Sequence, residues 1–220
     1  MNVISHEYAQ VAYLASPDEI KPVSGLYLPD LIAKISARYL FAMPPTDLAE
    51  AIKNGAKFAT GRYMHDGRLI SIQKLDVYRD GVIIGTNNTE DSDLIMNDIV
   101  NWMRGEFNFR VPLTSRKRYV SQIVVDFEIE FEKHMGIAAA VAEMCAGEFK
   151  GVSEFDHVMQ IGQFSVEIDP ANMPQYVNTK FLFERRIGYT YNVSRYLCSA
   201  PLPTVSHMTL LQRIEDLMRD

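Results

Sequence analysis

The chain has little cysteine and no long apolar run, and each absence excludes a class of protein. Its 220 residues include two cysteines, Cys145 and Cys198, too few for the disulfide framework of a secreted protein, so we expect both to be reduced and mostly packed. The richest apolar run, 136–145, is far shorter than the ~20 residues of a membrane-spanning helix. Residues 1–16 lack the basic start and apolar stretch of a secretory signal. The cytoplasm is therefore the expected location.

Sequence motifs that mark the common enzyme classes are missing as well. We find no Gly-x-Ser-x-Gly, Cys-x-x-Cys or His-x-x-x-His pattern and no glycine-rich phosphate-binding loop. The net charge of −6 opposes binding to nucleic-acid backbones and to anionic membranes unless basic residues cluster. We therefore expect no cofactor, no membrane association and little affinity for nucleic acid.

The residues that are present are typical of a globular chain of the α+β class. Hydrophobic residues make up 47% and charged residues 23%, an average globular composition, and the length fits one domain over residues 1–220. Apolar spacing predicts helices at 29–42, 89–105, 135–149 and 206–218, and a short one after Asp47. Strands are predicted at 69–78, 82–86, 119–131, 164–168 and 177–184. The mixed order favours a mainly antiparallel sheet with an Asp-Gly hairpin, packed with about five helices.

The sequence makes two local predictions, one about a turn and one about the single tryptophan. Asp80-Gly81 lies between two β-rich runs, which predicts a two-residue type I′ turn with positive φ at both positions. Trp102 lies on the apolar stripe of the helix at 89–105, which has the best N-terminal capping residues, so we expect it in the core.

The strand predicted at 119–131 carries an acidic face. Asp126, Glu128, Glu130 and Glu132 alternate along it, and His134 follows. Carboxylates two residues apart on a strand project to the same side, so Glu128, Glu130 and His134 could hold a hard metal cation. A solvated face that protects a sheet edge gives the same pattern, and we favour that interpretation over a metal site.

Nucleophilic catalysis by a cysteine is a further possibility. Cys145 lies on a predicted helix close to Glu143, and His134 and His157 are near in sequence, while Cys198 is followed by His207. A free cysteine in an alanine-rich helix is more often a small, inert hydrophobic residue. We therefore predict no catalytic residue.

The most basic stretch, 104–118, could bind nucleic acid. It contains Arg104, Arg110, Arg116, Lys117 and Arg118, and aromatic residues (Phe107, Phe109 and Tyr119) lie among and beside them. Three adjacent basic residues before a strand are commonly a solvated loop. The acidic balance of the whole chain also opposes this interpretation.

The segment 169–204, before the C-terminal helix, is rich in Tyr, Pro and Arg and is predicted to be irregular. Tyr and Arg are the side chains that protein interfaces concentrate. The candidate contact residues are Tyr176, Arg185, Arg186, Tyr189, Tyr191, Arg195 and Tyr196. The alternative is a segment that wraps its own domain with its tyrosines half buried.

These observations favour a non-enzymatic interaction or assembly subunit that associates with itself or with another protein through its Tyr/Arg-rich surface. The first alternative is a hydrolase or metal-dependent enzyme that uses the acidic strand face without a known motif. The second alternative is a nucleic-acid-binding protein that uses the 104–118 stretch.

Overall fold

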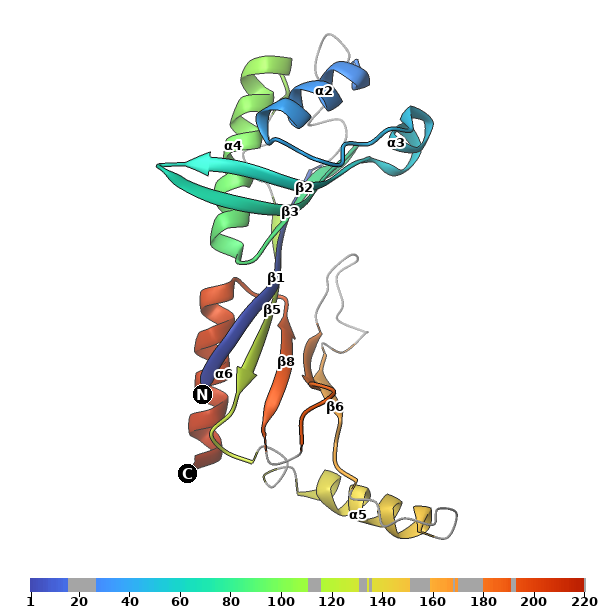
Figure 1. The fold of residues 1–220 in the computed structure, drawn as a ribbon, viewed down its shortest axis with the longest axis vertical. Coiled ribbons are helices and arrows are strands. Elements are labelled where there is room, and N and C mark those ends of the chain that lie inside the picture. Colours follow the sequence, from blue (N-terminus) through green and yellow to red (C-terminus); the bar gives the residue numbers. More distant parts are fainter. Residues whose placement is uncertain are drawn as a thin grey trace. The chain divides into compact units, whose positions relative to one another are not determined.

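The computed structural model describes residues 1–15, 27–110, 116–130, 134, 136–150, 159–167, 169, 180–190 and 193–219. Within these ranges the chain forms eight strands and five helices (Figure 1). The strands are β1 (Asn2–Leu14), β2 (Ala56–His65), β3 (Arg68–Tyr78), β4 (Gly81–Thr86), β5 (Arg116–Asp126), β6 (Gln163–Val166), β7 (Phe181–Arg185) and β8 (Arg195–Ala200). The helices are α2 (Leu28–Arg38), α3 (Leu48–Asn54), α4 (Thr89–Phe107), α5 (Ile137–Phe149) and α6 (Thr204–Arg219). The predicted α+β class is confirmed.

The strands hydrogen bond in the order β2-β3-β4-β1-β5-β8-β7-β6. The pairs β1–β4, β2–β3, β3–β4, β6–β7 and β7–β8 are antiparallel, as predicted for the sheet. No helix in the described part of the chain is long and apolar enough to cross a membrane.

The chain folds into two compact units, each with its own core. The central unit comprises Tyr8–Ser121 and Leu202–Thr204, and the terminal unit comprises Met1–Glu7, Gln122–Pro201 and Val205–Asp220. Strands β1 and β5 contribute residues to both units. The single domain expected over residues 1–220 stays a prediction.

In the central unit, three helices pack against one face of the sheet. Their apolar residues form a core with the inward-facing residues of β1 to β4, including Ile35, Ile72, Ile84 and Ile99. Two of the helices begin at side chains that accept hydrogen bonds from free backbone N–H groups: Asp47 for α3 and Asn88 for α4. These capping residues position both helices as the sequence predicts.

Trp102 packs against this core but is not enclosed by it. Its side chain is half-buried, and its ring makes an edge contact with Phe107, at 5.5 Å between ring centroids. The guanidinium of Arg38 covers the ring at 5.4 Å from its centroid. The prediction that Trp102 lies in the core therefore holds in part: the side chain packs against the core, but position 102 lies at the edge of the apolar stripe and stays half-buried.

The β3–β4 hairpin is confirmed, but its turn differs from the prediction. Tyr78 pairs with Gly81, so the two turn residues are Arg79 and Asp80. None of these four residues has a positive φ. A type I′ turn is found instead one hairpin earlier. There Asp66 (φ 49°) and Gly67 (φ 77°) connect β2 to β3 between the paired residues His65 and Arg68.

In the terminal unit, α6 packs against residues of β5, β7 and β8 (Figure 1). The core includes Ile123, Phe183, Tyr196, Cys198 and Leu211. Three strands were not predicted: β1, β2 and β8. Strand β8 lies inside the 169–204 segment, so the irregular structure predicted there is wrong for 195–200.

Candidate functional site

Two of the predicted contact residues, Arg185 and Tyr196, lie inside the terminal unit. They are paired residues on β7 and β8, and both side chains are buried. The Arg185 guanidinium donates to the Tyr196 hydroxyl at 3.2 Å and to the carbonyl oxygen of Val193 at 3.2 Å. This pair stabilises the hairpin and is not accessible to a partner on the surface.

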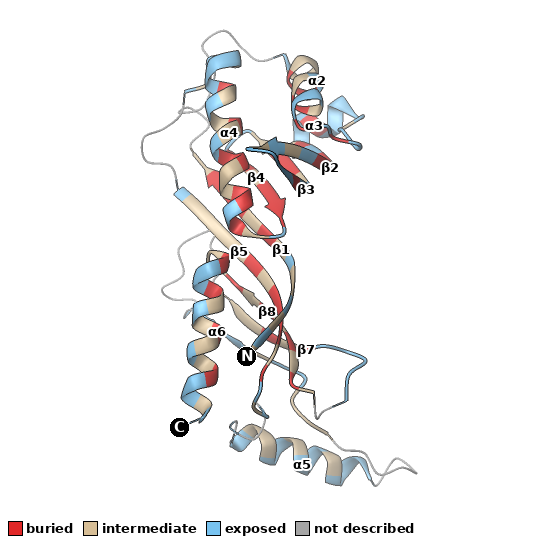
Figure 2. Ribbon diagram, turned by 60° about the vertical axis from the view of Figure 1, so that its left-hand side comes forward, coloured by how far each residue is buried: buried red, intermediate tan, exposed pale blue. Residues whose placement is uncertain are grey.

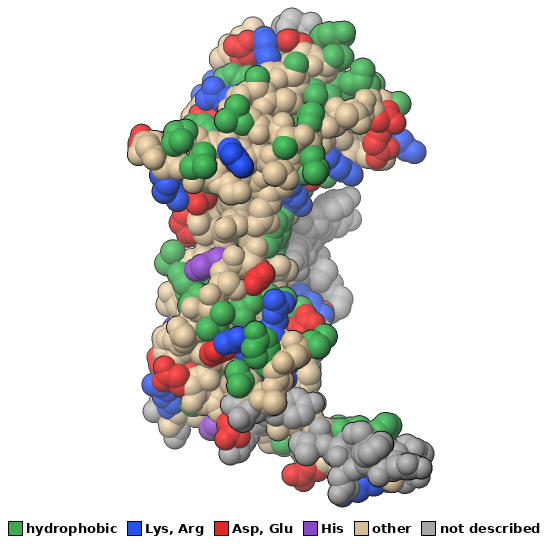
Figure 3. Space-filling view, viewed as in Figure 1, with side chains coloured by type: hydrophobic (Ala, Val, Ile, Leu, Met, Phe, Trp, Pro, Cys, Tyr) green, Lys and Arg blue, Asp and Glu red, His purple; other side chains and the backbone are tan. Residues whose placement is uncertain are grey.

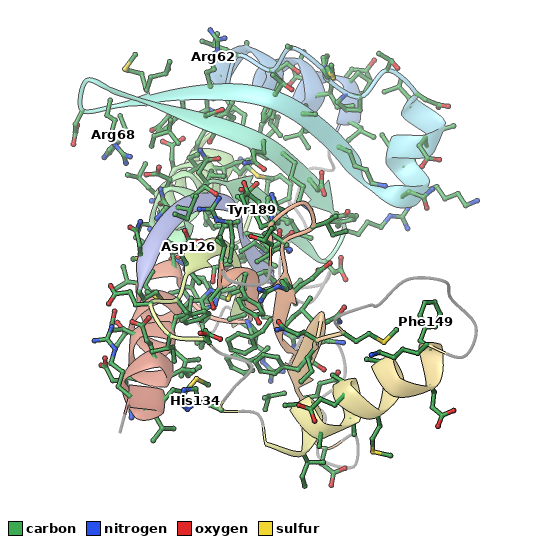
Figure 4. All side chains as sticks on the ribbon, turned by 60° about the horizontal axis from the view of Figure 1, so that its bottom comes forward. Arg62, Arg68, Asp126, His134, Phe149 and Tyr189 are labelled. Carbon is green, nitrogen blue, oxygen red and sulfur yellow. The ribbon has the colours of Figure 1, made fainter. Side chains whose placement is uncertain are left out.

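Arg195 and Tyr189 contact each other near the end of β5. The Arg195 guanidinium donates two hydrogen bonds of 2.6 Å to the Asp126 carboxylate and lies 4.3 Å from the centroid of the Tyr189 ring (Figure 4). Planar bidentate pairing of this kind fixes both side chains. Arg195 is therefore engaged within its own unit.

The tip between β7 and β8 is the part of the predicted surface that remains exposed. Ile187 is 95% exposed, and Tyr189 and Arg186 are also exposed, with the Arg186 guanidinium 3.9 Å from the Glu7 carboxylate. Tyr176 and Tyr191 lie outside the described residues. The interaction roles of all seven residues stay predictions.

The acidic run does not form the predicted strand face. Strand β5 ends at Asp126, and Glu128 follows it in a bend. Hydrogen bonds from the amino group of Met1 and from the Arg219 guanidinium hold the pKa of Glu128 below its ordinary value. The prediction of a wet strand face is wrong beyond residue 126, because the strand ends there and Glu128 pairs with the Met1 amino group and with Arg219.

The described residues also do not bring the candidate metal ligands together. His134 is exposed and lies apart from Asp126 (Figure 4). Glu132 lies outside the described residues, and no group of three His, Cys, Asp or Glu side chains within them could hold a metal ion.

Glu215 on α6 is the centre of an ion-pair cluster that the sequence did not indicate. Its side chain is fully buried and accepts a hydrogen bond of 2.7 Å from the backbone N–H of Glu128. It also pairs with the amino group of Met1 and, at 3.3 Å, with Arg219. The carboxylate thus connects α6 to the chain that follows β5.

The two cysteines differ sharply in environment. Cys198 is buried, and burial raises the pKa of its thiol, which keeps the thiol protonated and unreactive. Cys145 is exposed on α5, so the expectation that both cysteines are packed is wrong for Cys145. His157, one of its candidate bases, lies outside the described residues.

His207 is a buried imidazole on α6 whose pKa is lowered by burial to about 4, from an ordinary value of 6.5. As the pH falls through 6.5, the unfolded chain takes up a proton before the folded chain does. We expect the free energy of unfolding to fall by about 2 kcal/mol between pH 7 and pH 5. Urea titrations at several pH values should show this slope, and His207→Gln should flatten it. An unchanged slope in His207→Gln would show that other groups cause it.

The basic stretch is partly neutralised and its aromatic residues face inward. Lys117 donates to the Asp93 carboxylate at 2.5 Å, and the Tyr119 hydroxyl donates to the same carboxylate at 3.0 Å. Phe107 and Phe109 pack against the core of the central unit. Stacking on nucleic-acid bases needs exposed rings, so these contacts weaken the nucleic-acid interpretation.

Asp76 on β3 is a buried carboxyl group that sequence reasoning missed. It is 7% exposed, on the sheet face opposite the core residue Leu75. The Tyr78 hydroxyl donates to it at 3.3 Å, and the Lys74 ammonium lies 3.9 Å away and 5.7 Å from the ring centroid of Tyr8. Burial raises the pKa of Asp76, and burial together with the nearby Asp76 charge raises the pKa of Tyr8 to about 12. A carboxyl of this kind can exchange a proton closer to neutral pH than an exposed one.

Asp76 is expected to lower stability at neutral pH. As the pH rises through the ordinary pKa of 3.8, the unfolded chain releases its proton first, so the charged form favours unfolding. Asp76→Asn should therefore raise the free energy of unfolding at pH 7 by about 1 kcal/mol, the scale of a typical substitution. The gain should disappear below pH 3.8. Chemical denaturation measures the free energy of unfolding of Asp76→Asn and of a control, Asp80→Asn, at an exposed turn position. Equal changes in the two variants would contradict the prediction.

Helix α5 is unusual because it is apolar and exposed. None of its thirteen residues, all of which the structure describes, is buried (Figure 2). Ile137 is 86% exposed and Met144 71%, and Val141 and Phe149 are also exposed. Hydrophobic side chains are visible at its surface in Figure 3. An open apolar depression of about 650 Å³ lies between this helix and Met159.

No protein family, curated protein or solved structure matches this chain. The function therefore has to be inferred from the residues and their contacts.

Proposed function

We propose that this protein is an interaction or assembly subunit and that α5 is its main contact surface. The observation that carries the proposal is the exposure of a whole apolar helix. A helix of thirteen residues is marginal in water when no tertiary contact buries one of its faces. Exposed apolar patches of this kind mark interaction sites in folded proteins.

The contacts of the other candidate residues give less support to the alternative functions. Asp126 is bound by Arg195, and Glu128 by Arg219, so neither carboxylate is available to activate water or hold a cation. The buried Cys198 thiol is not in the reactive thiolate form. Lys117 is paired with Asp93, which weakens the basic surface. An interaction subunit requires none of these groups.

Site-specific photocrosslinking in the native host tests the proposal. A benzophenone amino acid in place of Met144 should give discrete covalent adducts, because a partner would lie within contact distance of the exposed side chain. The matched control places the same amino acid at Arg213, which is exposed on α6. Adducts from position 144 should disappear when Ile137 and Val141 are both changed to Glu. Equal, diffuse labelling from both positions would refute the proposed role of α5.

A further inference from the structure

Four of the exposed apolar residues of α5 form a stripe that ends in a carboxylate. Ile137, Ala140, Val141, Met144 and Glu148 lie at spacings of three and four residues, so they share one face of the helix. All five are exposed. Glu143 lies roughly 120° around the helix from the centre of this stripe.

The N-terminus of α5 lacks both a side-chain cap and a compensating negative charge. Its N-cap residue is Gly136, which offers no side-chain cap, and no acidic residue lies in the first turn. No basic residue lies in its last turn, where Glu148 places a negative charge instead. The helix dipole makes the N-terminus partly positive and the C-terminus partly negative. Lys150, the C-cap residue, partly offsets the negative end, whereas no acidic side chain of the first turn offsets the positive N-terminus.

We propose that α5 binds α5 of a second copy of this chain, with the two helices antiparallel. This proposal rests on the proposed function and names the partner. When the stripes of the two copies are aligned at their midpoints, Glu148 of each copy lies level with Ile137 of the other, beside the uncapped N-terminus of that helix. Val141 of each copy then faces Met144 of the other. One two-fold contact thus covers both apolar stripes and places a carboxylate beside the uncapped N-terminus of each helix.

The charges of α5 also favour a second copy of the chain over a lipid surface as the partner. Helices that lie on membranes carry Lys or Arg on their polar face and bind anionic lipids. The charged residues of α5 are Glu143 and Glu148, and the chain has a net charge of −6. The self-complementary ends of the helix favour a second copy.

Sedimentation velocity of the full chain over a range of concentrations tests the dimer. The wild type should show a monomer–dimer equilibrium, and Met144→Glu should raise its dissociation constant by about 100-fold, because each dimer loses two central contacts. Glu148→Lys should raise it by at least about tenfold, whereas the matched control Glu143→Lys should change it little. Glu148→Lys also improves the charge at the end of its own helix, so a weaker dimer would not reflect unfolding of α5.

Disulfide trapping tests the orientation. In a Cys145→Ala background, Ile137→Cys chains mixed with tagged Glu148→Cys chains should form a mixed disulfide under mild oxidation. Either chain alone should stay uncrosslinked, because identical positions would lie about 16 Å apart along the helices. Disulfides between identical positions would show a parallel pair and overturn the proposal.

The outcomes distinguish this inference from the function on which it rests. A chain that is monomeric at every concentration, yet gives adducts with another protein from position 144, would overturn the self-pairing and keep the interaction function. A monomer that gives no specific adducts would overturn both. A dimer that is equally sensitive to Glu143→Lys and Glu148→Lys would overturn the antiparallel arrangement.

Discussion

Glu215→Ala is expected to destabilise the protein by about 3 kcal/mol, because it removes the buried carboxylate of an ion-pair cluster and leaves exposed Glu128 as the remaining partner of the Met1 amino group and of Arg219. The backbone N–H of Glu128 would lose its 2.7 Å acceptor, and Arg219 would lose a partner at 3.3 Å. Breaking a buried pair on one side is far more costly than removing an exposed one. Thermal and urea unfolding would measure the change.

Two variants control for this result. Asp216→Ala removes the neighbouring exposed carboxylate and should change stability by less than about 0.5 kcal/mol. Glu215→Gln keeps an oxygen that can accept the hydrogen bond from the backbone N–H of Glu128. Its loss of stability should lie between those of Glu215→Ala and Asp216→Ala. Equal effects of Glu215→Ala and Asp216→Ala would show that the cluster does not stabilise the terminal unit.

Gly81→Ala is expected to cost about 3 kcal/mol, although Gly81 has no positive φ. A Cβ atom at this position would lie 2.3 Å from the carbonyl oxygen of Tyr13 on the neighbouring strand β1. The clash involves backbone, so it can be relieved only by displacing β1 from β4. Gly105→Ala adds the same atom in open space on α4 and should be neutral or slightly stabilising. Equal stability of the two variants would contradict the close approach of β1.

The two Asp-Gly pairs show which features of a turn can be predicted from local sequence. Asp80-Gly81 is preceded and followed by clear β-rich runs, so the hairpin could be predicted from the sequence. The turn type could not be predicted, because glycine is needed at position 81 for the close approach of β1, a strand that is distant in sequence. Asp66-Gly67 carried the same signal and forms the type I′ turn, but β2 before it has no clean alternation to draw attention to it.

Strands were harder to predict than helices, as β1 and β8 show. The capping residues Asp47 and Asn88 mark helix starts by local chemistry, and both predictions hold. Strand β1 mixes polar residues with apolar ones, and its two ends belong to different units. Strand β8 is short and lies among Tyr, Pro and Arg residues that resemble a loop.

The candidate sites depend on tertiary contacts that a sequence does not display. The helix at 135–149 was predicted, but an apolar stripe has the same spacing whether it is core or surface. Asp76 accepts a hydrogen bond from Tyr78 on its own strand, and the pairing of β3 with β4 and of β4 with β1 brings Tyr8 near enough to respond to its charge. The Tyr/Arg composition of 169–204 did identify residues with many contacts, although Arg185 and Tyr196 make them internally.

Hydrogen exchange of residues 137–149 at increasing protein concentration tests the central claim most directly. A helix without buried residues should exchange rapidly in the dilute monomer and become protected as α5 is covered. Peptides from 95–103, in the core part of α4, should stay protected throughout. We predict that protection of 137–149 rises with concentration and that Glu148→Lys shifts the rise to higher concentration. Protection of 137–149 that is the same at all concentrations would contradict the pairing of α5 with a second copy.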